Sequence, residues 1–333
     1  MRNLVGRRLS VLAAVSAAVV GVVAAATAAP SRVPNWAGPE IATVVSHGLM
    51  AQSVKTFRPN DPLTRDSLSS LDSGLTDALT PPPTTTTTTT STDPTATTET
   101  TTTDSTTATG TTATATTLSD PNGTVTMAQL DSNLVATLGL SHAAAEFNHG
   151  ARAAGIPVPS RFGTEVVARL LALRLNHPAA QDFLELRPQD PATRAEAAYS
   201  AAQILGFGPF GSGWQTAWVQ GLADSFALPQ LTSWQRQILT VAFSKIGMPY
   251  VWGGTSDDSE VDFGVPARGG YDCSGFVWRV YKLQNYANEG DLASVIQGRT
   301  TMVMSVEVPR SKRIGFQNLQ PADVLFFGTK GSK

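Results

Sequence analysis

The sequence is poor in cysteine, in aromatic residues and in net charge. Its 333 residues include a single Cys, 7% aromatic residues, and 24 Lys and Arg against 26 Asp and Glu. One thiol cannot form an internal disulfide or supply a Cys-rich zinc site, so both frameworks are excluded. A formal charge of −2 lacks the basic footprint of a nucleic-acid binder, so we expect no nucleic-acid partner.

Long apolar runs are confined to the N-terminus. Residues 1–28 begin with three arginines, continue through an apolar stretch from Val11 to Ala26, and end in a small-residue Ala-Thr-Ala site. This pattern is typical of a cleaved secretory signal peptide, and it predicts export. The alternative is an uncleaved membrane anchor, because the apolar stretch is nearly long enough to span a bilayer.

A Thr-rich segment is the clearest internal boundary. Residues 84–117 contain 23 Thr among 34 positions and almost no large apolar side chain. Such a segment cannot bury enough surface to offset its ordering entropy, so we expect a disordered linker. It divides the remaining chain into two pieces, 29–83 and 118–333, and the first piece is too short to hold a large core by itself.

A short phrase recurs on both sides of this linker. The run from Phe57 to Arg65 carries a Pro-punctuated turn, and Thr64 is placed to cap the helix that follows. The phrase Asp-Pro-x-Thr-Arg returns at Asp190–Arg194, and fainter echoes lie at Thr124–Leu140. The recurrence indicates a repeated helix–turn–helix unit.

At these residues the sequence resembles the surface-layer homology modules of bacterial wall proteins. The resemblance rests on a Trp-Ala start, a Phe-x-Pro turn and a Thr-Arg helix opening, and it makes 29–83 and 118–231 surface-layer-homology-like regions. It implies that anionic wall polymer is a partner and that Arg65 and Arg194 help to bind it. The alternative is that both arginines pair locally at helix starts.

Residues 118–231 are expected to be mostly α-helical. From Ala143 to Leu205 the chain is rich in Ala and Leu at helical spacing, with breaks at prolines. His142, His149 and His177 lie here at spacings that do not form a zinc helix, so surface or packing roles are favoured over metal binding. We therefore expect no metal site.

Residues 232–333 change character and carry the candidate chemistry. Thr232 and Gln235 form a capping box for one helix. Asp272 is a good N-cap for a second helix, which places Cys273 in its first turn. Unpaired N–H groups and the helix dipole favour a thiolate there and could hold an oxyanion. The alternative is an inert buried Cys.

Three ordered motifs in this region resemble the NlpC-type (NlpC/P60) cysteine peptidases that cut peptidoglycan stem peptides. They are Pro-Tyr-Val-Trp-Gly-Gly from Pro249, Asp-Cys-Ser-Gly-Phe from Asp272, and Gln-Pro-Ala-Asp-Val-Leu-Phe-Phe from Gln320. The resemblance implies an α+β, papain-like domain at 232–333 in which the Cys helix packs on a small antiparallel sheet. It also implies Cys273 as nucleophile, with Tyr250, Asp272 and Ser274 lining the pocket for the amine and D-Glu end of the stem.

Three further features of this region allow two interpretations. For Trp252 we favour packing in the aromatic core, whereas for Tyr250 core packing and substrate binding are equally plausible. Arg299-Thr300-Thr301 falls where the family often has an Arg and small polar residues, a weaker carry-over. The acidic loop through Asp257 and Glu260 lacks the ligand periodicity of a calcium site, so we expect solvated acids.

The sequence has no His after Cys273. In the family the general base is a His on the strand that follows the Asp-Val-Leu-Phe-Phe strand, and here the chain stops at Lys333. Without a base the Cys–His mechanism is incomplete, and we expect little activity from the chain as given. We expect a C-terminally truncated, and hence incomplete, peptidase domain; the alternative is a degenerate, non-catalytic member.

The sequence thus predicts a secreted, cell-wall-associated bacterial hydrolase. The expected reaction is cleavage of an amide bond in peptidoglycan stem peptides through an acyl-enzyme on Cys273, without a cofactor. Two alternatives remain: a Cys/His-type peptidoglycan amidase, which shares the Asp-Cys-Ser-Gly segment, and a non-catalytic wall-binding protein with a degenerate peptidase domain.

Overall fold

The computed structural model describes residues 36–81, 120–262, 265–284, 286, 296–307, 309, 311 and 313–328. Apart from Trp36, these residues belong to one unit, Ala37–Lys333. The predicted signal peptide and the predicted Thr-rich linker lie outside the described residues. Within the described part, every helix is too short or too polar to traverse a bilayer.

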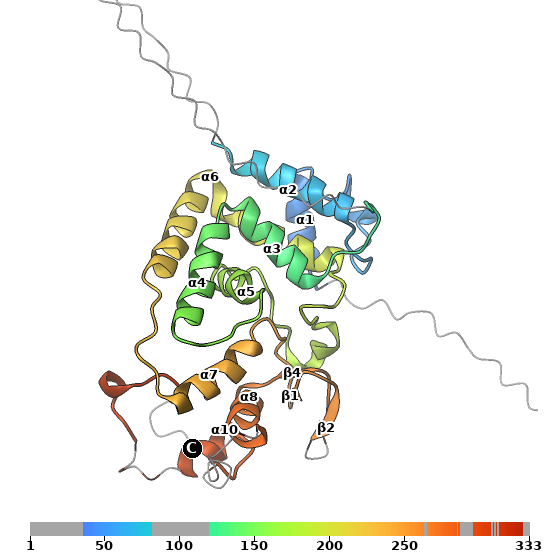
Figure 1. Cartoon of the computed structure of the whole chain (residues 1–333). Coiled ribbons are helices and arrows are strands. Elements are labelled where there is room, and N and C mark those ends of the chain that lie inside the picture. Colours follow the sequence, from blue (N-terminus) through green and yellow to red (C-terminus); the bar gives the residue numbers. More distant parts are fainter. Residues whose placement is uncertain are drawn as a thin grey trace, which may run out of the picture. The chain divides into compact units, whose positions relative to one another are not determined.

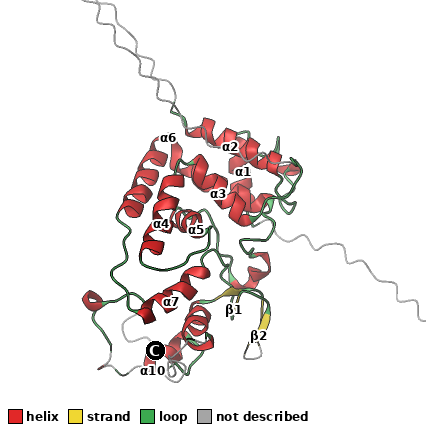
Figure 2. Cartoon of the chain, in the orientation of Figure 1, coloured by secondary structure: helices red, strands yellow, loops and turns green. Residues whose placement is uncertain are grey.

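The described residues between 37 and 231, here called the helical region, have only helices and helical turns as their named elements (Figure 2). They form a bundle that packs around α6 and α5, with α1 and α2 both in contact with α6 (Figure 1). The elements are α1 (Gly38–Ser46), the 3₁₀ turn η1 (Val54–Thr56), α2 (Arg65–Leu79), α3 (Met127–Thr137), α4 (Ser141–Ala153), α5 (Phe162–Leu170), the 3₁₀ turn η2 (Ala179–Leu184) and α6 (Arg194–Asp224). A positive φ of 64° at Gly208, just before Pro209, kinks α6.

Three of these helices begin in the same way. Thr64, Thr126 and Thr193 are the N-caps of α2, α3 and α6, and each side chain accepts the N–H three residues on, at 3.2–3.3 Å. Each cap satisfies an N–H group that the helix itself leaves unpaired. The prediction that Thr64 caps a helix is confirmed, and the segment that contains Thr126 is a full third copy of the same device.

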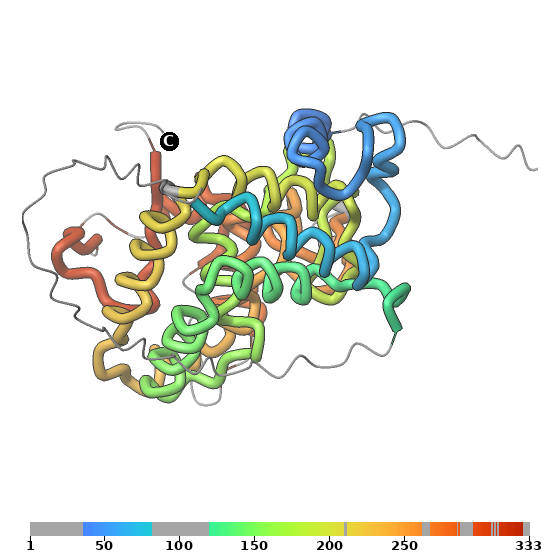
Figure 3. The backbone as a smooth tube through the Cα atoms, turned by 90° about the horizontal axis from the view of Figure 1, so that it is seen from above, coloured from blue at the N-terminus to red at the C-terminus, as the bar shows by residue number. Residues whose placement is uncertain are grey.

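The three segments before these caps close into a ring of backbone hydrogen bonds. Leu63 N–H donates to Ala192 O at 2.8 Å, Ala192 N–H donates to Val125 O at 2.8 Å, and Val125 N–H donates to Leu63 O at 2.9 Å. Chain on both sides of the segment 82–119 therefore contributes to one body, in which α2 lies beside α3 (Figure 3). A short first piece gains the partners that its own length could not supply.

The helical region buries a continuous apolar core. Its largest fully buried side chains are Phe57, Ile41, Leu63, Leu71, Leu75, Met127, Leu130, Leu134, Leu140, Ile156, Leu173 and Ile204. Seven of them lie in α1, α2, α3 and α6, and the other five lie in the segments that connect the helices. Removal of this surface from water is the main force that holds the repeats together.

A cluster of charged side chains lies inside the same core. Asp131 and Glu165 are fully buried, and Arg174 approaches them at 2.8 Å and 4.0 Å. Both carboxylate oxygens of Glu165 lack a hydrogen-bond donor among the described residues. Burial, reinforced by the charge of Asp131, raises the pKa of Glu165 to about 7, although Arg174 opposes the shift.

Residues 232–328, here called the C-terminal region, mix short helices with short strands. The helices are α7 (Ser233–Ser244), α8 (Cys273–Trp278), the π-helical turn η3 (Arg279–Leu283), α10 (Thr301–Glu307) and the 3₁₀ turn η5 (Phe316–Asn318). The strands β1 (Thr255–Ser256) and β4 (Gly270–Tyr271) pair antiparallel, as do β2 (Glu260–Asp262) and β3 (Val265–Ala267). The predicted capping box of Thr232 and Gln235 is confirmed at the start of α7.

The last described segment does not form the expected strand. Asp323–Gly328 runs without a β-ladder, and Leu325, Phe326 and Phe327 are 47%, 44% and 88% exposed. A strand needs a neighbour for its N–H and C=O groups, and the described residues offer none here. The small sheet of the predicted α+β domain is therefore reduced to two two-stranded ribbons.

Arg161 and Phe162 connect the two regions. The Arg161 guanidinium, just before α5, donates to Ile246 O at 3.1 Å and to Ser244 O at 2.9 Å, where it satisfies carbonyls at the end of α7. The ring of Phe162 stacks on Phe243, with centroids 4.9 Å apart. The helical region thus holds the end of α7, and the residues of the candidate site follow α7 in the sequence.

Candidate functional site

Cys273 is the first residue of α8, as the sequence predicts. Asp272 is the N-cap, and its Oδ1 accepts the Gly275 N–H at 2.5 Å. The Cys273 side chain is exposed, so the alternative of an inert buried Cys is wrong. The thiol lies at the helix end where backbone N–H groups are directed.

Arg299 holds this helix end in place. One Nη donates to Ser274 Oγ at 2.7 Å and to Asp272 Oδ1 at 3.2 Å, and the other donates to Gly253 O at 3.0 Å. Asp272 and Arg299 are 13% and 16% exposed, so the pair is largely shielded from water. Arg299, which the resemblance implied only weakly, thus joins Asp272, Ser274 and Gly253.

Close packing of glycines brings α8 against the Gly253–Gly254 turn. Gly253 has a positive φ of 77° and donates its N–H to Asp272 Oδ2 at 3.0 Å. A Cβ at Gly275 would lie 1.9 Å from Gly254 O, and a Cβ at Gly254 would lie 2.4 Å from Gly270 O. These approaches require glycine, and they explain why the two Gly-containing motifs belong to one site.

A pocket of about 390 Å³ opens at Cys273. Its lining residues come from both sides of α8 and are Tyr250, Trp252, Gly253, Asp272, Cys273, Ser274, Arg299, Thr300, Thr301 and Met302. Trp252 is 63% exposed at this pocket, so its expected place in the aromatic core is wrong. The turn at Gly253 directs the indole outward rather than into the interior.

The predicted substrate-binding residues all line this pocket but differ in their surroundings. Ser274 is 8% exposed, and its Oγ donates to Asp272 Oδ1 at 3.0 Å while it accepts from Arg299. Tyr250 is half-buried; burial raises the pKa of its phenol, and the charges of Cys273 and other nearby acids add to the shift. Tyr250 therefore stays protonated and available as a hydrogen-bond donor near neutral pH.

No histidine is among the residues that line the pocket. His47 is the C-cap of α1, and its Nδ1 lies 2.9 Å from Thr43 O. His177 is buried with Nε2 3.4 Å from Glu196 Oε1, and His142 and His149 lie on α4. The described pocket lining has a candidate nucleophile and a carboxylate–guanidinium pair, but no imidazole.

Two acids of the loop after Gly254 form ion pairs. Asp257 lies 2.6 Å from Lys245 Nζ and accepts the Tyr271 hydroxyl at 2.8 Å, and Glu260 lies 3.5 Å from Arg279. Their side chains are 48% and 30% exposed, so both acids stay partly solvated while they pair with Lys245, which follows α7, and with Arg279 of η3. Nowhere in the described residues do three or more His, Cys, Asp or Glu gather as a metal site would require.

The two candidate polymer-binding arginines make local contacts. Arg194 donates to Phe57 O at 2.8 Å and to Met50 O at 2.5 Å, and its guanidinium lies 4.9 Å from the Phe57 ring centroid. Arg65 donates to Asp120 O at 3.2 Å. These bonds favour the alternative that Arg194 pairs locally, because its Nε and one Nη both donate to carbonyls of the helical region.

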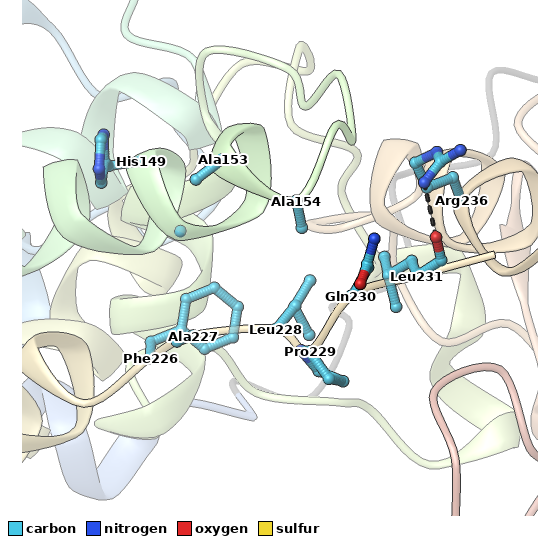
Figure 4. A pocket seen from close by; sticks show the side chains of 11 residues that line it. His149, Ala153, Ala154, Phe226, Ala227, Leu228, Pro229, Gln230, Leu231 and Arg236 are labelled. Carbon is cyan, nitrogen blue, oxygen red and sulfur yellow. Dashed lines mark hydrogen bonds between the residues drawn. The ribbon is translucent and has the colours of Figure 1, made fainter. Parts of the chain in front are cut away.

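A second cavity of about 500 Å³ lies where α4 meets the α6–α7 connection. Figure 4 shows it lined by His149, Ala153, Phe226, Leu228 and Arg236, among others. Arg236 is engaged with Leu231 O at 2.6 Å. Its lining residues include no nucleophile beside an acid, so Cys273 remains the candidate for chemistry.

Comparisons with known families agree with this geometry. A model described as the NlpC/P60 family matches residues 247–333, and a model described as the S-layer homology domain matches residues 31–68. The comparisons with curated proteins and with solved structures gave no match. The chain carries an NlpC/P60 domain and an N-terminal S-layer homology domain, which together support a peptidoglycan hydrolase held at the bacterial cell wall.

Proposed function

We propose that this protein is an exported cysteine endopeptidase that cleaves an amide bond in peptidoglycan stem peptides through a thioester on Cys273. The observation that carries the proposal is the exposed Cys273 thiol at the start of α8, inside a pocket whose wall is held by Asp272 and Arg299. A nucleophile and backbone N–H groups at a helix N-terminus, which can hold an oxyanion, are two of the parts that acyl transfer needs, and a general base is the third.

In the proposed reaction the Cys273 thiolate attacks the carbonyl carbon of the scissile amide. The Gly275 N–H is occupied by Asp272, so we assign the oxyanion to the backbone N–H groups of Cys273 and Ser274. The carbon–nitrogen bond then breaks as the leaving amine takes a proton from water, and the hydroxide that is left hydrolyses the thioester to the free acid and the Cys273 thiolate. The described residues that line the pocket include no imidazole, so we assign the proton-transfer step to none of them.

The substrate lies, in this proposal, between Tyr250 and the start of α8. The protonated Tyr250 phenol donates to the peptide, while Ser274 and Arg299 orient Asp272 toward it. Trp252 covers the outer edge of the pocket with an exposed indole. The stem end that carries the free amine and D-Glu is the substrate part expected at these residues.

Wall attachment is proposed for the helical region, and secretion for the segment 1–28. The S-layer homology match supports attachment at the cell wall through anionic polymer. Arg65 remains a candidate for this contact, and Arg194 would have to give up its bonds to Phe57 O and Met50 O to join it. The proposed domain boundaries are 1–28, 29–83, 84–117, 118–231 and 232–333.

The pocket without an imidazole also supports the non-catalytic alternative, in which the protein only binds walls. A Cys/His-type amidase remains the second enzymatic alternative. Digestion of purified muropeptides by the complete gene product, followed by product mass spectrometry, separates the three. Cleavage between stem residues supports the endopeptidase, cleavage at the glycan–stem junction supports the amidase, and wall sedimentation without any cleavage supports the binder.

A further inference from the structure

A loop of the helical region lies against the edge of the Cys273 pocket. Asp182, in η2, accepts the backbone N–H of Trp252 on its Oδ2 at 2.6 Å. Next to it, the Phe183 carbonyl accepts from Arg268, and Arg187 approaches Asp258 at 3.9 Å. Residues 182–187 therefore contact Trp252, which lines the pocket, and also Asp258 and Arg268 of the following loop and strands. Residues 182–187 themselves lie outside the NlpC/P60 match.

Around the pocket and its edge, four acids face three arginines: Asp182, Asp190, Asp258 and Asp272 against Arg187, Arg268 and Arg299. Asp272 pairs with Arg299. Arg187 pairs with both Asp190 and Asp258. Arg268 also acts electrostatically on Asp190, so these two cations offset these two acids. No ion pair of the described residues includes Asp182, whose Oδ1 is buried without a hydrogen-bond donor. One negative charge is left over.

That charge reaches the pocket. The groups that act electrostatically on Tyr250, a lining residue, are Cys273, Asp272 and Asp182, and all three are acidic. An uncompensated charge next to a pocket shifts the local concentration of charged ligands according to their sign. Because its Oδ1 is shielded from water, Asp182 is screened less by salt than an exposed acid would be.

We infer that Asp182 is a specificity-determining residue of the Cys273 pocket: its carboxylate holds the Trp252 edge and supplies the net negative charge that favours substrates with a positive group beside the scissile bond. Asp182 acts through Trp252 and through space, so it is a positioning residue rather than a catalytic one. The inference rests on the proposed function, because it takes the Cys273 pocket as the substrate site. It assigns to the helical region a part in substrate selection besides attachment.

The single Cys makes this charge measurable without turnover. Methanethiosulfonate reagents that carry a trimethylammonium group, a sulfonate group or a neutral methyl group each form a disulfide with Cys273 and release a sulfinate. The readout is the cation-to-anion ratio of second-order rate constants at low ionic strength, divided by the same ratio for a free small thiol. For the unmodified chain we expect a normalised ratio of about ten, the size that one unit charge produces at pocket distance in a partly aqueous medium.

Three variants separate charge from packing. Asp182→Asn keeps an oxygen acceptor for the Trp252 N–H and removes the charge, so the normalised ratio falls to about one while the neutral reagent reacts at the same rate. Asp182→Ala gives the same fall in the ratio. Asp77→Asn, an equal charge change on exposed α2, leaves the ratio unchanged.

The inference is overturned if Asp182→Asn keeps the full ratio, or if it slows all three reagents equally, since either result would make Asp182 purely structural. A loss of the ratio in Asp182→Ala alone has the same meaning. The proposed function is tested separately: a protein that shows the charge effect but cleaves no muropeptide refutes the peptidase alone, and the reverse result refutes only the role of Asp182.

Discussion

The helical region and the C-terminal region bury their apolar side chains to very different extents. Leu63, Leu130 and Ile204 of the helical region have no exposed surface, whereas Phe316 and Phe327 of the C-terminal region are 80% and 88% exposed. Helices satisfy their backbone groups internally and need only a partner for one face. Strands need partners for both backbone and side chains, so the C-terminal region depends on chain far away in sequence.

The largest expected effect concerns the ring that joins the three helix starts. A chain that begins at residue 120 lacks Leu63, which closes two of the three backbone hydrogen bonds of the ring, together with α1 and α2. We expect its helical region to lose cooperative unfolding altogether. Removal of residues 247–333 instead leaves the ring and its core in place, and we expect cooperative unfolding to persist.

Circular dichroism during urea titration measures both deletions. Cooperative unfolding of the chain that starts at residue 120 would refute the interdependence of the three segments. Loss of cooperativity in the chain that ends at residue 246 would instead show that the helical region needs the C-terminal region, which would remove the contrast between them.

The next effect concerns the buried ion pair of the helical region. Arg174→Met leaves Asp131 and Glu165 buried without their cation, and we expect the free energy of unfolding to fall by about 3–5 kcal/mol. The control is Arg58→Ala. The Arg58 side chain is 75% exposed and pairs with Asp61, so we expect the free energy of unfolding to fall by less than about 1 kcal/mol. Equal effects in urea titrations would argue against a buried cluster.

The pH dependence of stability tests Glu165 itself. Its pKa is raised from 4.5 to about 7 on folding, so between these values the folded chain binds a proton that the unfolded chain has lost. The free energy of unfolding therefore falls as the pH rises from about 4.5 to 7, by about 3 kcal/mol from this group. Burial also raises the pKa of Asp72 to about 6, which adds a slope of the same sign.

Glu165→Gln removes the Glu165 part of this slope. We expect the variant to lose less stability than the unmodified chain between pH 5 and pH 8, measured by urea titration at each pH. Asp77→Asn on exposed α2 is the matched control and should keep the original slope. An unchanged slope in Glu165→Gln would contradict the raised pKa.

The smallest effect concerns glycine packing in the C-terminal region. Gly275→Ala places a Cβ 1.9 Å from Gly254 O, so α8 must shift; we expect a loss of about 1–3 kcal/mol that is confined to this region. Gly221→Ala is the matched control, because a Cβ there meets nothing within 4 Å and α6 should gain up to about 1 kcal/mol. Hydrogen exchange resolves the two regions, and faster exchange in α1–α6 of Gly275→Ala would show that they are coupled.

Features set by neighbouring residues could be predicted from the sequence. The caps Thr64, Thr232 and Asp272 follow from one side chain and the N–H three residues on, and all three are present. The placement of Cys273 in the first turn of α8 follows from the cap. The resemblance to two families rests on motifs of the same local kind, and the family matches confirm it.

Features set by distant contacts could not be predicted. Trp252 is an aromatic residue in an apolar phrase, yet the positive φ of Gly253 and the hydrogen bond to Asp182 turn it toward the pocket. Arg299 stands in no strong motif, and its three contacts come from segments 25 to 46 residues earlier. Asp182 gave no signal at all, because its role depends on how two regions meet.

The most direct test of the central claim measures muropeptide cleavage by the complete gene product and by its Cys273→Ser variant. Ser69→Ala, on the exposed side of α2, serves as the control, and circular dichroism verifies the fold of each protein. We predict cleavage of a stem amide by the unmodified protein and by Ser69→Ala, and none above background by Cys273→Ser. Equal cleavage by the folded Cys273→Ser variant would contradict the assignment of the nucleophile.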